Sequence, residues 1–442
     1  MSRKHFTAFL LCFLLPVFLF NAFAHVSELS LDDAINLALE YNLSLRKTEI
    51  DITSSGYHES NLWSEIFPTI NASASAGYRG ALFGDSPTGS SGFNYSVGFG
   101  INFGLNAGIP YALRSIKLAH QGNILRYEDA RNLLSIQITK NFFSLIAEKN
   151  NLVLLEEIFN LAQRQFTRSE TLFRNGLVGE LSLTQSRLTL ENARFNQSAG
   201  RIAYENNLME FLAMLGIGIM PETPASTFNL IGEINIVRIN VDAEELITNY
   251  LPSRPDIIRN KQEIERLTIT HMQTVRQTRA PSLSLSVDYN TSSFNPYSDT
   301  FSATARLNIP IDPWIPGTAR EQSISRASGA IEKARLDLMM TENTAKAQIR
   351  SLSSLLRNSW DSILIARLSM ESAQRSYQLT ERGFLNGTVE ALVLQDARNN
   401  LTIARQRLLQ SELSYFNMIL DLSAAVNISW KNLIENYGVT SE

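Results

Sequence analysis

Two long stretches of the chain carry an apolar residue at every seventh position. The first stripe is Ile138, Leu145, Leu152, Phe159, Phe166 and Phe173, and the second is Ile349, Leu356, Ile363, Met370, Tyr377 and Phe384. A seven-residue period sustained this long is typical of supercoiled helices packed side by side. Residues 111–220 and 317–442 contain no proline, and Pro110 and Pro316 stand just before them. Because proline is favoured in the first turn of a helix and excluded from its interior, two very long helical segments are predicted.

Each long segment is interrupted once by a turn signal. Asn175-Gly176 and Asn386-Gly387 tolerate a left-handed backbone, so each segment is expected to fold back into an antiparallel helical hairpin. The return arms are predicted at 180–214 and 389–424. Shorter helices are predicted at 42–66 and 254–279.

Four runs of alternating residues precede the long helices, two before each. They are residues 70–78, 95–105, 283–289 and 301–309, joined by loops rich in Gly, Ser, Asn and Pro. A period of two predicts strands of about ten residues, which suits either ordinary hairpins on a core or the wall of a membrane barrel. Four strands are too few to close a barrel with a lumen, and lipid does not tolerate open sheet edges. We therefore expect other copies to pair these edges, with three copies supplying twelve strands.

The alternation assigns side chains to the two faces of such a barrel. The polar set expected to face the water-filled lumen is Asn102, Ser286, Asp288 and Arg306. The apolar set expected to face lipid is Phe99, Ile101, Val287 and Leu307.

The second half of the chain repeats the first. Between Ala162 and Arg194, 14 of 33 positions are identical to those 211 residues later, and an upstream match at an offset of 213 pairs Pro68 with Pro281. The predicted organisation is a first repeat over 25–214 and a second over 253–424. Residues 215–252 form an equatorial linker region between the repeats, and residues 425–442 form a short C-terminal tail.

The N-terminus and the composition narrow the function. Arg3 and Lys4 precede an apolar run that ends in Ala22-Phe23-Ala24, which predicts a signal peptide over 1–24 in preference to an uncleaved membrane anchor. The only cysteine, Cys12, lies in that leader, and the five histidines are scattered. The formal net charge is −4 without basic runs, which argues against a nucleic-acid partner. Neither a cofactor nor a metal is expected, and no catalytic motif indicates an enzyme.

Taken together, these features resemble the TolC family of outer-membrane efflux proteins. The resemblance covers about residues 28–424 and implies an α+β membrane protein of duplicated strand pairs and long coiled-coil hairpins. It further implies a homotrimer in outer-membrane lipid, with a 12-stranded transmembrane β-barrel and a periplasmic α-helical barrel. The implied partners are a periplasmic adaptor (membrane fusion) protein and an inner-membrane pump or ABC exporter.

The resemblance also assigns roles at the two helical tips. Tight reversal at the tip glycines is expected to leave Leu177, Val178, Thr388 and Val389 exposed. The residues expected to dock the adaptor are Asn175, Gly176, Leu177, Val178, Asn386, Gly387, Thr388 and Val389. Phe384 and Asp396 match an aromatic and an aspartate of the periplasmic gate, whereas Val389 and Val393 replace an arginine and a second aspartate found in many relatives. Packing is therefore expected to hold this gate more than charge, and Asp396 could equally be a solvated carboxylate.

Two questions stay open from the sequence. The architecture suits efflux of small molecules through a tripartite pump and type I secretion of proteins equally well. The alternative to a channel is a secreted periplasmic coiled-coil structural or adaptor protein. Adaptors carry a single hairpin and separate β-domains, whereas this chain repeats a strand pair with each hairpin.

Overall fold

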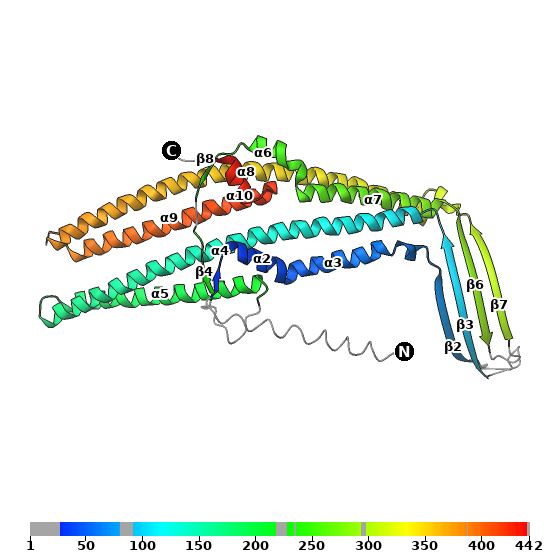
Figure 1. Ribbon diagram of the computed structural model, residues 1–442, viewed down its shortest axis with the longest axis horizontal. Coiled ribbons are helices and arrows are strands. Elements are labelled where there is room, and N and C mark those ends of the chain that lie inside the picture. The colour runs from blue at the N-terminus through cyan, green and yellow to red at the C-terminus, as the bar shows by residue number, and fades with distance from the viewer. Residues whose placement is uncertain are drawn as a thin grey trace. The chain divides into compact units, whose positions relative to one another are not determined.

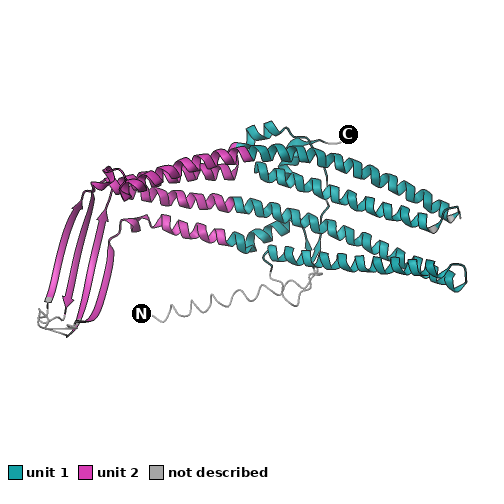
Figure 2. Cartoon of the chain, turned by 180° about the vertical axis from the view of Figure 1, so that it is seen from behind, with its two compact units in different colours: residues 1–46, 129–251, 345–442 teal, residues 47–128, 252–344 magenta. Residues whose placement is uncertain are grey.

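The fold is that of a computed structural model, which describes residues 27–79, 92–217, 228–233, 236–292, 298–386 and 388–439. The chain divides into two compact units, coloured separately in Figure 2. The first comprises residues 1–46, 129–251 and 345–442, and the second comprises residues 47–128 and 252–344. The expected signal peptide (1–24) and Gly387 lie outside the described residues.

The second unit contains a four-stranded antiparallel sheet. Its strands are β2 (Thr69–Arg79), β3 (Gly92–Leu105), β6 (Ser282–Ser292) and β7 (Ser298–Asn308), in the order β2-β3-β6-β7. The β3–β6 pair joins the two repeats, since it pairs the second strand of the first repeat with the first strand of the second repeat. All four predicted strands are confirmed.

Helices flank this sheet along the chain. They are most of α3 (Leu43–Ser60), the short 3₁₀ helix η2 (Leu62–Glu65), α7 (Pro255–Arg279) and η5 (Asp312–Trp314). The prediction of one helix over 42–66 is wrong at its end, because the α-helix stops at Ser60 and a 3₁₀ turn follows. α7 begins with Pro255 in its first turn, where the missing amide hydrogen of proline costs nothing.

The first unit contains the reversing ends of two long helical hairpins. α4 (Ile109–Arg174) returns as α5 (Glu180–Met214), and α8 (Ala319–Leu385) returns as α9 (Ala391–Val426). Figure 1 shows each return helix running beside its outgoing partner. Within the first hairpin, Asn207 Nδ2 on α5 donates hydrogen bonds of 2.9 and 3.0 Å to the Glu148 carboxylate on α4. Both predicted hairpins are confirmed.

Part of each predicted heptad stripe forms the core of the first unit. Ile138 and Leu145 on α4 are 0% and 2% exposed, and Ile363 on α8 is 0% exposed. Toward the tip the residues of the α4 stripe become more exposed to solvent, and Phe173 is 39% exposed. Ile363 is already buried by residues of its own chain. Its burial therefore does not require contact with another copy of the chain.

Several small elements were not predicted from the sequence. They are β1 (Ser27–Leu29), α2 (Leu31–Tyr41), β4 (Phe228–Leu230), β5 (Arg238–Ile239), α6 (Ala243–Tyr250), the 3₁₀ helix η4 (Leu251–Ser253), α10 (Trp430–Tyr437) and β8 (Gly438–Val439). β1 pairs in parallel with β4, and β5 pairs antiparallel with β8. The linker region and the C-terminal tail therefore meet in one small sheet.

A buried tyrosine fastens the linker region to α9. Tyr415 is 0% exposed, its hydroxyl accepts a hydrogen bond from Ile239 N at 2.8 Å, and it donates one to Val237 O at 3.0 Å. Burial raises the pKa of Tyr415, so the phenol stays neutral and able to donate.

The duplication is also visible in how the return helices end. Gly216 follows α5 with φ +82°, and Asn427, 211 residues later, follows α9 with φ +55°. Each next amide reaches back to the last turn, from Ile217 N to Leu212 O and from Ile428 N to Ser423 O, both at 3.1 Å. Glycine and asparagine are the residues that tolerate this left-handed cap.

Candidate functional site: the helical tips, the gate and the sheet face

The first tip is a tight glycine-dependent turn at the end of α4. Gly176 has φ +71°, and its amide donates to Phe173 O at 2.9 Å. The Leu177 amide donates to Leu172 O, also at 2.9 Å, which completes the capping pattern of a helix that reverses. The left-handed turn predicted at Gly176 is confirmed. Leu177 extends into solvent with 69% of its surface exposed.

The second tip closes by the same backbone contact. Thr388 N donates to Gly383 O at 2.9 Å, and the Thr388 hydroxyl donates to the same oxygen at 2.9 Å. Asn386 and Thr388 are exposed, as is Asn175 at the first tip. The part of the prediction that concerns Gly387 falls outside the described residues.

Two of the residues expected to be exposed at the tips are not. Val178 and Val389 are half-buried. At the second tip the reason is that the chain folds back over Gly383, where a Cβ atom would lie only 2.6 Å from Val389 Cγ2. Of the three apolar residues expected to be exposed at the tips, Leu177 is therefore exposed, and Val178 and Val389 are not.

The two predicted gate residues lie on different helices. Phe384 is half-buried near the end of α8, and the Arg168 guanidinium on α4 lies 5.7 Å from the centre of its ring. An arginine over an aromatic face is attracted by the negative potential of the ring. Arg168 could not be found from the sequence, because its contact joins residues more than 200 positions apart.

Asp396 lies on an exposed face of α9. Leu392 and Val393, which precede it by about one helical turn, are 64% and 50% exposed. Arg398 turns away from this face, with its guanidinium 5.8 Å from the centre of the Tyr377 ring on α8. The face thus combines one carboxylate with apolar side chains.

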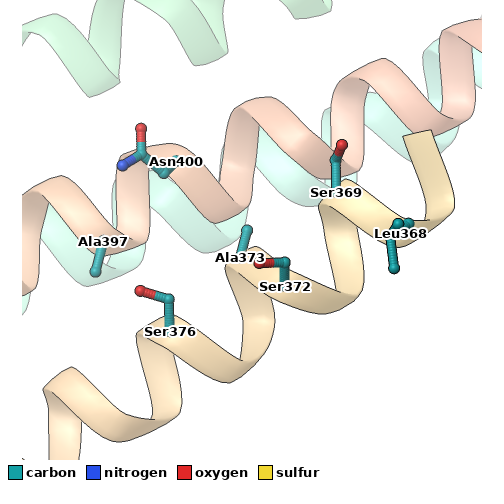
Figure 3. Close-up of a pocket in the computed structure, with 7 residues that line it drawn as sticks. All are labelled: Leu368, Ser369, Ser372, Ala373, Ser376, Ala397 and Asn400. Atoms are coloured by element: carbon teal, nitrogen blue, oxygen red, sulfur yellow. The ribbon is translucent and has the colours of Figure 1, made fainter. Parts of the chain in front are cut away.

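A shallow groove of about 460 Å³ lies between α8 and α9 close to this face (Figure 3). Its lining residues are Leu368, Ser369, Ser372, Ala373, Ser376, Ala397 and Asn400. All except Leu368 and Asn400 have side chains no larger than serine, which allows two helix backbones to approach closely.

The four residues assigned to a lumen share one face of the sheet. Asn102 on β3 is opposite Ser286 on β6, Asp288 follows Ser286 by two residues, and Arg306 on β7 is opposite Ser284. Residues directly opposite and residues two apart point to the same side of a sheet. The predicted co-facial arrangement of the polar set is therefore present.

Glycines make room for the polar side chains on this face. A Cβ atom at Gly100 would lie 2.7 Å from Asn71 Oδ1 and 2.8 Å from Asp288 Oδ1, on the two flanking strands. Asn102 Nδ2 donates to Asn71 Oδ1 at 3.4 Å. The glycines of β3 are therefore explained by the strand register, which places Gly100 between the side chains of Asn71 and Asp288.

The opposite face of the sheet is apolar and exposed. The exposed fractions are 57% for Phe99, 46% for Ile101, 40% for Val287 and 63% for Leu307. Ile101 is opposite Val287 in the β3–β6 register, so these side chains form one continuous surface.

No helix among the described residues is long and apolar enough to cross a membrane. Over the same part of the chain, no cluster of three or more His, Cys, Asp or Glu residues could hold a metal ion.

Two segments of the chain, residues 34–217 and 246–427, match the family model of the outer membrane efflux protein. The chain belongs to this family. Each matched segment covers most of one repeat, and the family is one of efflux transport in the outer membrane. The resemblance to TolC-type outer-membrane efflux proteins is confirmed, and so is the location in the outer membrane.

Individual relatives in this family are distant but nearly full-length. The cation efflux system protein CusC of Escherichia coli O157:H7 is 23% identical over 404 residues, which cover 88% of this chain and 83% of CusC. The solvent efflux pump outer membrane protein SrpC of Pseudomonas putida is 23% identical over 412 residues, covering 90% and 84%. The crystal structure of the Campylobacter jejuni CmeC outer membrane channel matches the fold with a TM-score of 0.73 at 20% identity, over 93% of this chain and 87% of CmeC.

Proposed function

We propose that three copies of this chain form a duct that carries substrate through the periplasm and across the outer membrane. The observation that carries the proposal is the four-stranded sheet, with one polar and one exposed apolar face. Among the described strands, β2 and β7 each have a neighbour on one side only. Three such sheets joined edge to edge supply the twelve strands of a closed barrel with a polar lumen.

In this proposal the helical hairpins of the three copies form a tunnel on the periplasmic side. The tips dock a periplasmic adaptor protein, and the adaptor connects the tunnel to an inner-membrane pump or ABC exporter. Leu177 is the apolar contact that the first tip offers, with Asn175, Asn386 and Thr388 as polar surroundings. Phe384 and Asp396 form the periplasmic gate.

We infer small molecules as the cargo, in preference to secreted proteins. Relatives that cover most of this chain are named for the efflux of cations or of solvents. A duct does not itself select between cargoes, so the inference rests on these names. The division into a signal peptide, two repeats, an equatorial linker region and a short tail is part of the same proposal.

The alternative, a soluble periplasmic coiled-coil protein, leaves the apolar sheet face unexplained. Four large apolar side chains on that face are each at least 40% exposed. Packing within a single chain therefore does not bury them. An exposed contiguous apolar surface of this kind marks contact with lipid or with another molecule.

Cysteine labelling on neighbouring residues tests the duct directly. Asn102→Cys and Ile101→Cys are matched variants, because the two residues are adjacent on β3 and point to opposite faces. A charged, membrane-impermeant thiol reagent is added to the protein in a planar bilayer. We expect it to modify Asn102→Cys and lower the single-channel conductance, while Ile101→Cys stays unmodified. Labelling of Ile101→Cys alone, or of both equally, would reject the lumen.

A further inference from the structure

The polar face of the four-stranded sheet carries very few charges. This face, which holds Asn102, Ser286, Asp288 and Arg306, is called the lumen face below, and most of its other residues are serine, threonine, asparagine or glycine. Among the residues of this face whose side chains the structure describes, only Asp288 on β6 and Arg306 on β7 are charged. These two residues therefore set the sign of the electrostatic potential along the face.

The strand register places the two charges at different levels of the sheet. Arg306 is directly opposite Ser284, close to the end of the sheet that connects to the helices, because β6 begins at Ser282 soon after α7. Asp288 is four residues beyond Ser284 on β6, which is about 13 Å at the rise of an extended strand. This separation exceeds the Debye length of about 10 Å in 0.1 M salt, so neither charge cancels the other.

The strands next to Asp288 do not neutralise it. β3, which pairs with β6 on one side, contains no charged residue. Its Gly100 leaves room for the carboxylate, because a Cβ atom there would lie 2.8 Å from Asp288 Oδ1. On the other side, Asp288 is opposite Ser302 of β7. In the described part of the chain, no ion pair involves Asp288 or Arg306. Each charge therefore faces the lumen without a partner of opposite sign.

Closing the barrel does not supply the missing partners. In the proposed duct, β7 of one copy pairs with β2 of the next, since each of these described strands has a neighbour on one side only. β2 contains no acidic residue, so it does not neutralise Arg306 across this seam. Three copies therefore present three arginines at one level of the lumen and three aspartates at another.

We propose that Asp288 and Arg306 determine how the barrel discriminates between ions of opposite charge. The three Arg306 side chains form a positive ring on the side of the lumen that connects to the helices, and the three Asp288 carboxylates form a negative ring about 13 Å further along. This inference rests on the proposed three-copy duct and names the residues that set its charge preference.

The size of a twelve-stranded barrel brings every ion close to both rings. Strands about 4.8 Å apart and tilted by about 40° form a cylinder with a backbone radius of about 12 Å. Charged ends of side chains on its inner surface then lie within about 10 Å of the axis, which is about one Debye length in 0.1 M salt. At this distance, three unit charges in water change the local concentration of a monovalent ion about twofold to threefold.

Each ring favours one sign of ion. The Arg306 ring raises the local concentration of anions, and the Asp288 ring raises that of cations. Removing one ring leaves the preference of the other, so substitutions at the two positions should shift the selectivity in opposite directions.

The order of the rings also predicts that the current is rectified. Anions pass the Arg306 ring readily from the helical side, and cations pass the Asp288 ring readily from the opposite side. A voltage that is positive on the side of the Asp288 ring drives both ions into the segment between the rings and raises the conductance. The opposite voltage empties this segment and lowers it. The exchange variant Asp288→Lys with Arg306→Asp should reverse the direction of rectification when it is added to the same chamber as the wild type.

Recordings of single channels in planar bilayers test the proposal. In an approximately tenfold KCl gradient centred on about 0.1 M, the reversal potential gives the ratio of K⁺ to Cl⁻ permeability. We expect Asp288→Asn to lower this ratio about twofold and Arg306→Gln to raise it about twofold. Both shifts should disappear at about 1 M salt, where the Debye length is about 3 Å. The gate residues are unchanged in every variant, so the shifts report the barrel.

Asp299→Asn is the matched control for the loss of a carboxylate. Asp299 is opposite Thr291 in the β6–β7 register and three residues from Ser302, so it points to the other face of the sheet. Its removal should leave the permeability ratio unchanged. Asp288→Glu keeps the charge and should also retain the wild-type ratio.

A second neutral variant keeps the test independent of one substitution. Asp288→Ser introduces a residue that β6 already carries at positions 284 and 286 of the same face. If the channels have the mass of three chains, but the ratio is unchanged in Asp288→Asn and Asp288→Ser or in Arg306→Gln, the proposed rings are wrong and the duct stands. An equal shift in Asp299→Asn also overturns the rings. A wild-type chain that forms no channel contradicts the duct itself.

Discussion

Replacing Gly176 with alanine isolates the cost of the left-handed turn at the first tip. Gly176 has φ +71°, and a Cβ atom added there meets no other atom within 4 Å, so the penalty comes from the backbone alone. A left-handed conformation costs a non-glycine residue about 1–2 kcal/mol. The loss of unfolded-state entropy on changing glycine to alanine returns about 0.4–1 kcal/mol. We expect a net destabilisation of roughly 1 kcal/mol, or about fivefold in the opening equilibrium of the tip.

Hydrogen exchange at the first tip measures this opening. The Leu177 amide is bonded to Leu172 O only while the turn is closed, so its exchange should accelerate about fivefold in Gly176→Ala. Gly329→Ala is the control, because Gly329 lies within α8 and also has open space around an added Cβ atom. There the same methyl group should slow local exchange, since alanine favours a helix over glycine by about 1 kcal/mol. Unchanged or slower exchange at Leu177 in Gly176→Ala would refute the reasoning.

Three further substitutions probe other parts of the molecule. Tyr415→Phe leaves a buried amide and a carbonyl without their partner and should lower the free energy of unfolding by about 1–3 kcal/mol, measured by denaturant titration. Burial alone would raise the pKa of Asp256, but hydrogen bonds and charge from Arg254 outweigh it and lower the pKa. The resulting stability is present above the unfolded-state pKa of aspartate and is lost as pH falls through the lowered value, so Arg254→Met should move acid unfolding to higher pH. Asp396→Ala should change cation block of the channel in planar bilayers, and an unchanged block would make Asp396 an ordinary surface carboxylate.

The long helices and the four strands could be predicted because their patterns are sustained. The α4 stripe continues over six positions and five heptads from Ile138 to Phe173, and each strand alternates over about ten residues. β1, β5 and β8 have only two or three residues, which is too short for a period to appear. Their pairing depends on contacts between the linker region and the tail, and on partners such as Tyr415 that are distant in sequence.

Exposure at the tips and along the stripes was harder to predict than secondary structure. Val178 and Val389 have equivalent positions after their turns and were expected to be exposed, but both are half-buried, and at the second tip Val389 folds over Gly383. Likewise, a heptad spacing does not reveal whether its partner is in the same chain. Ile363 is covered by its own chain, whereas Phe195 is 72% exposed. The first difference depends on side-chain packing within one turn and the second on which helix covers a stripe, and the heptad spacing encodes neither.

The central claim is that three copies assemble into one duct through their sheet edges and hairpins. The mass of the intact complex, released from outer membranes in a mild detergent and measured by native mass spectrometry, tests this claim most directly. We expect three mature chains in a single species, with the strand signal in circular dichroism retained. A stable monomer or dimer with the same strand signal would contradict the account, because the outer edges of β2 and β7 would then be stable without the partners that a closed twelve-stranded barrel provides.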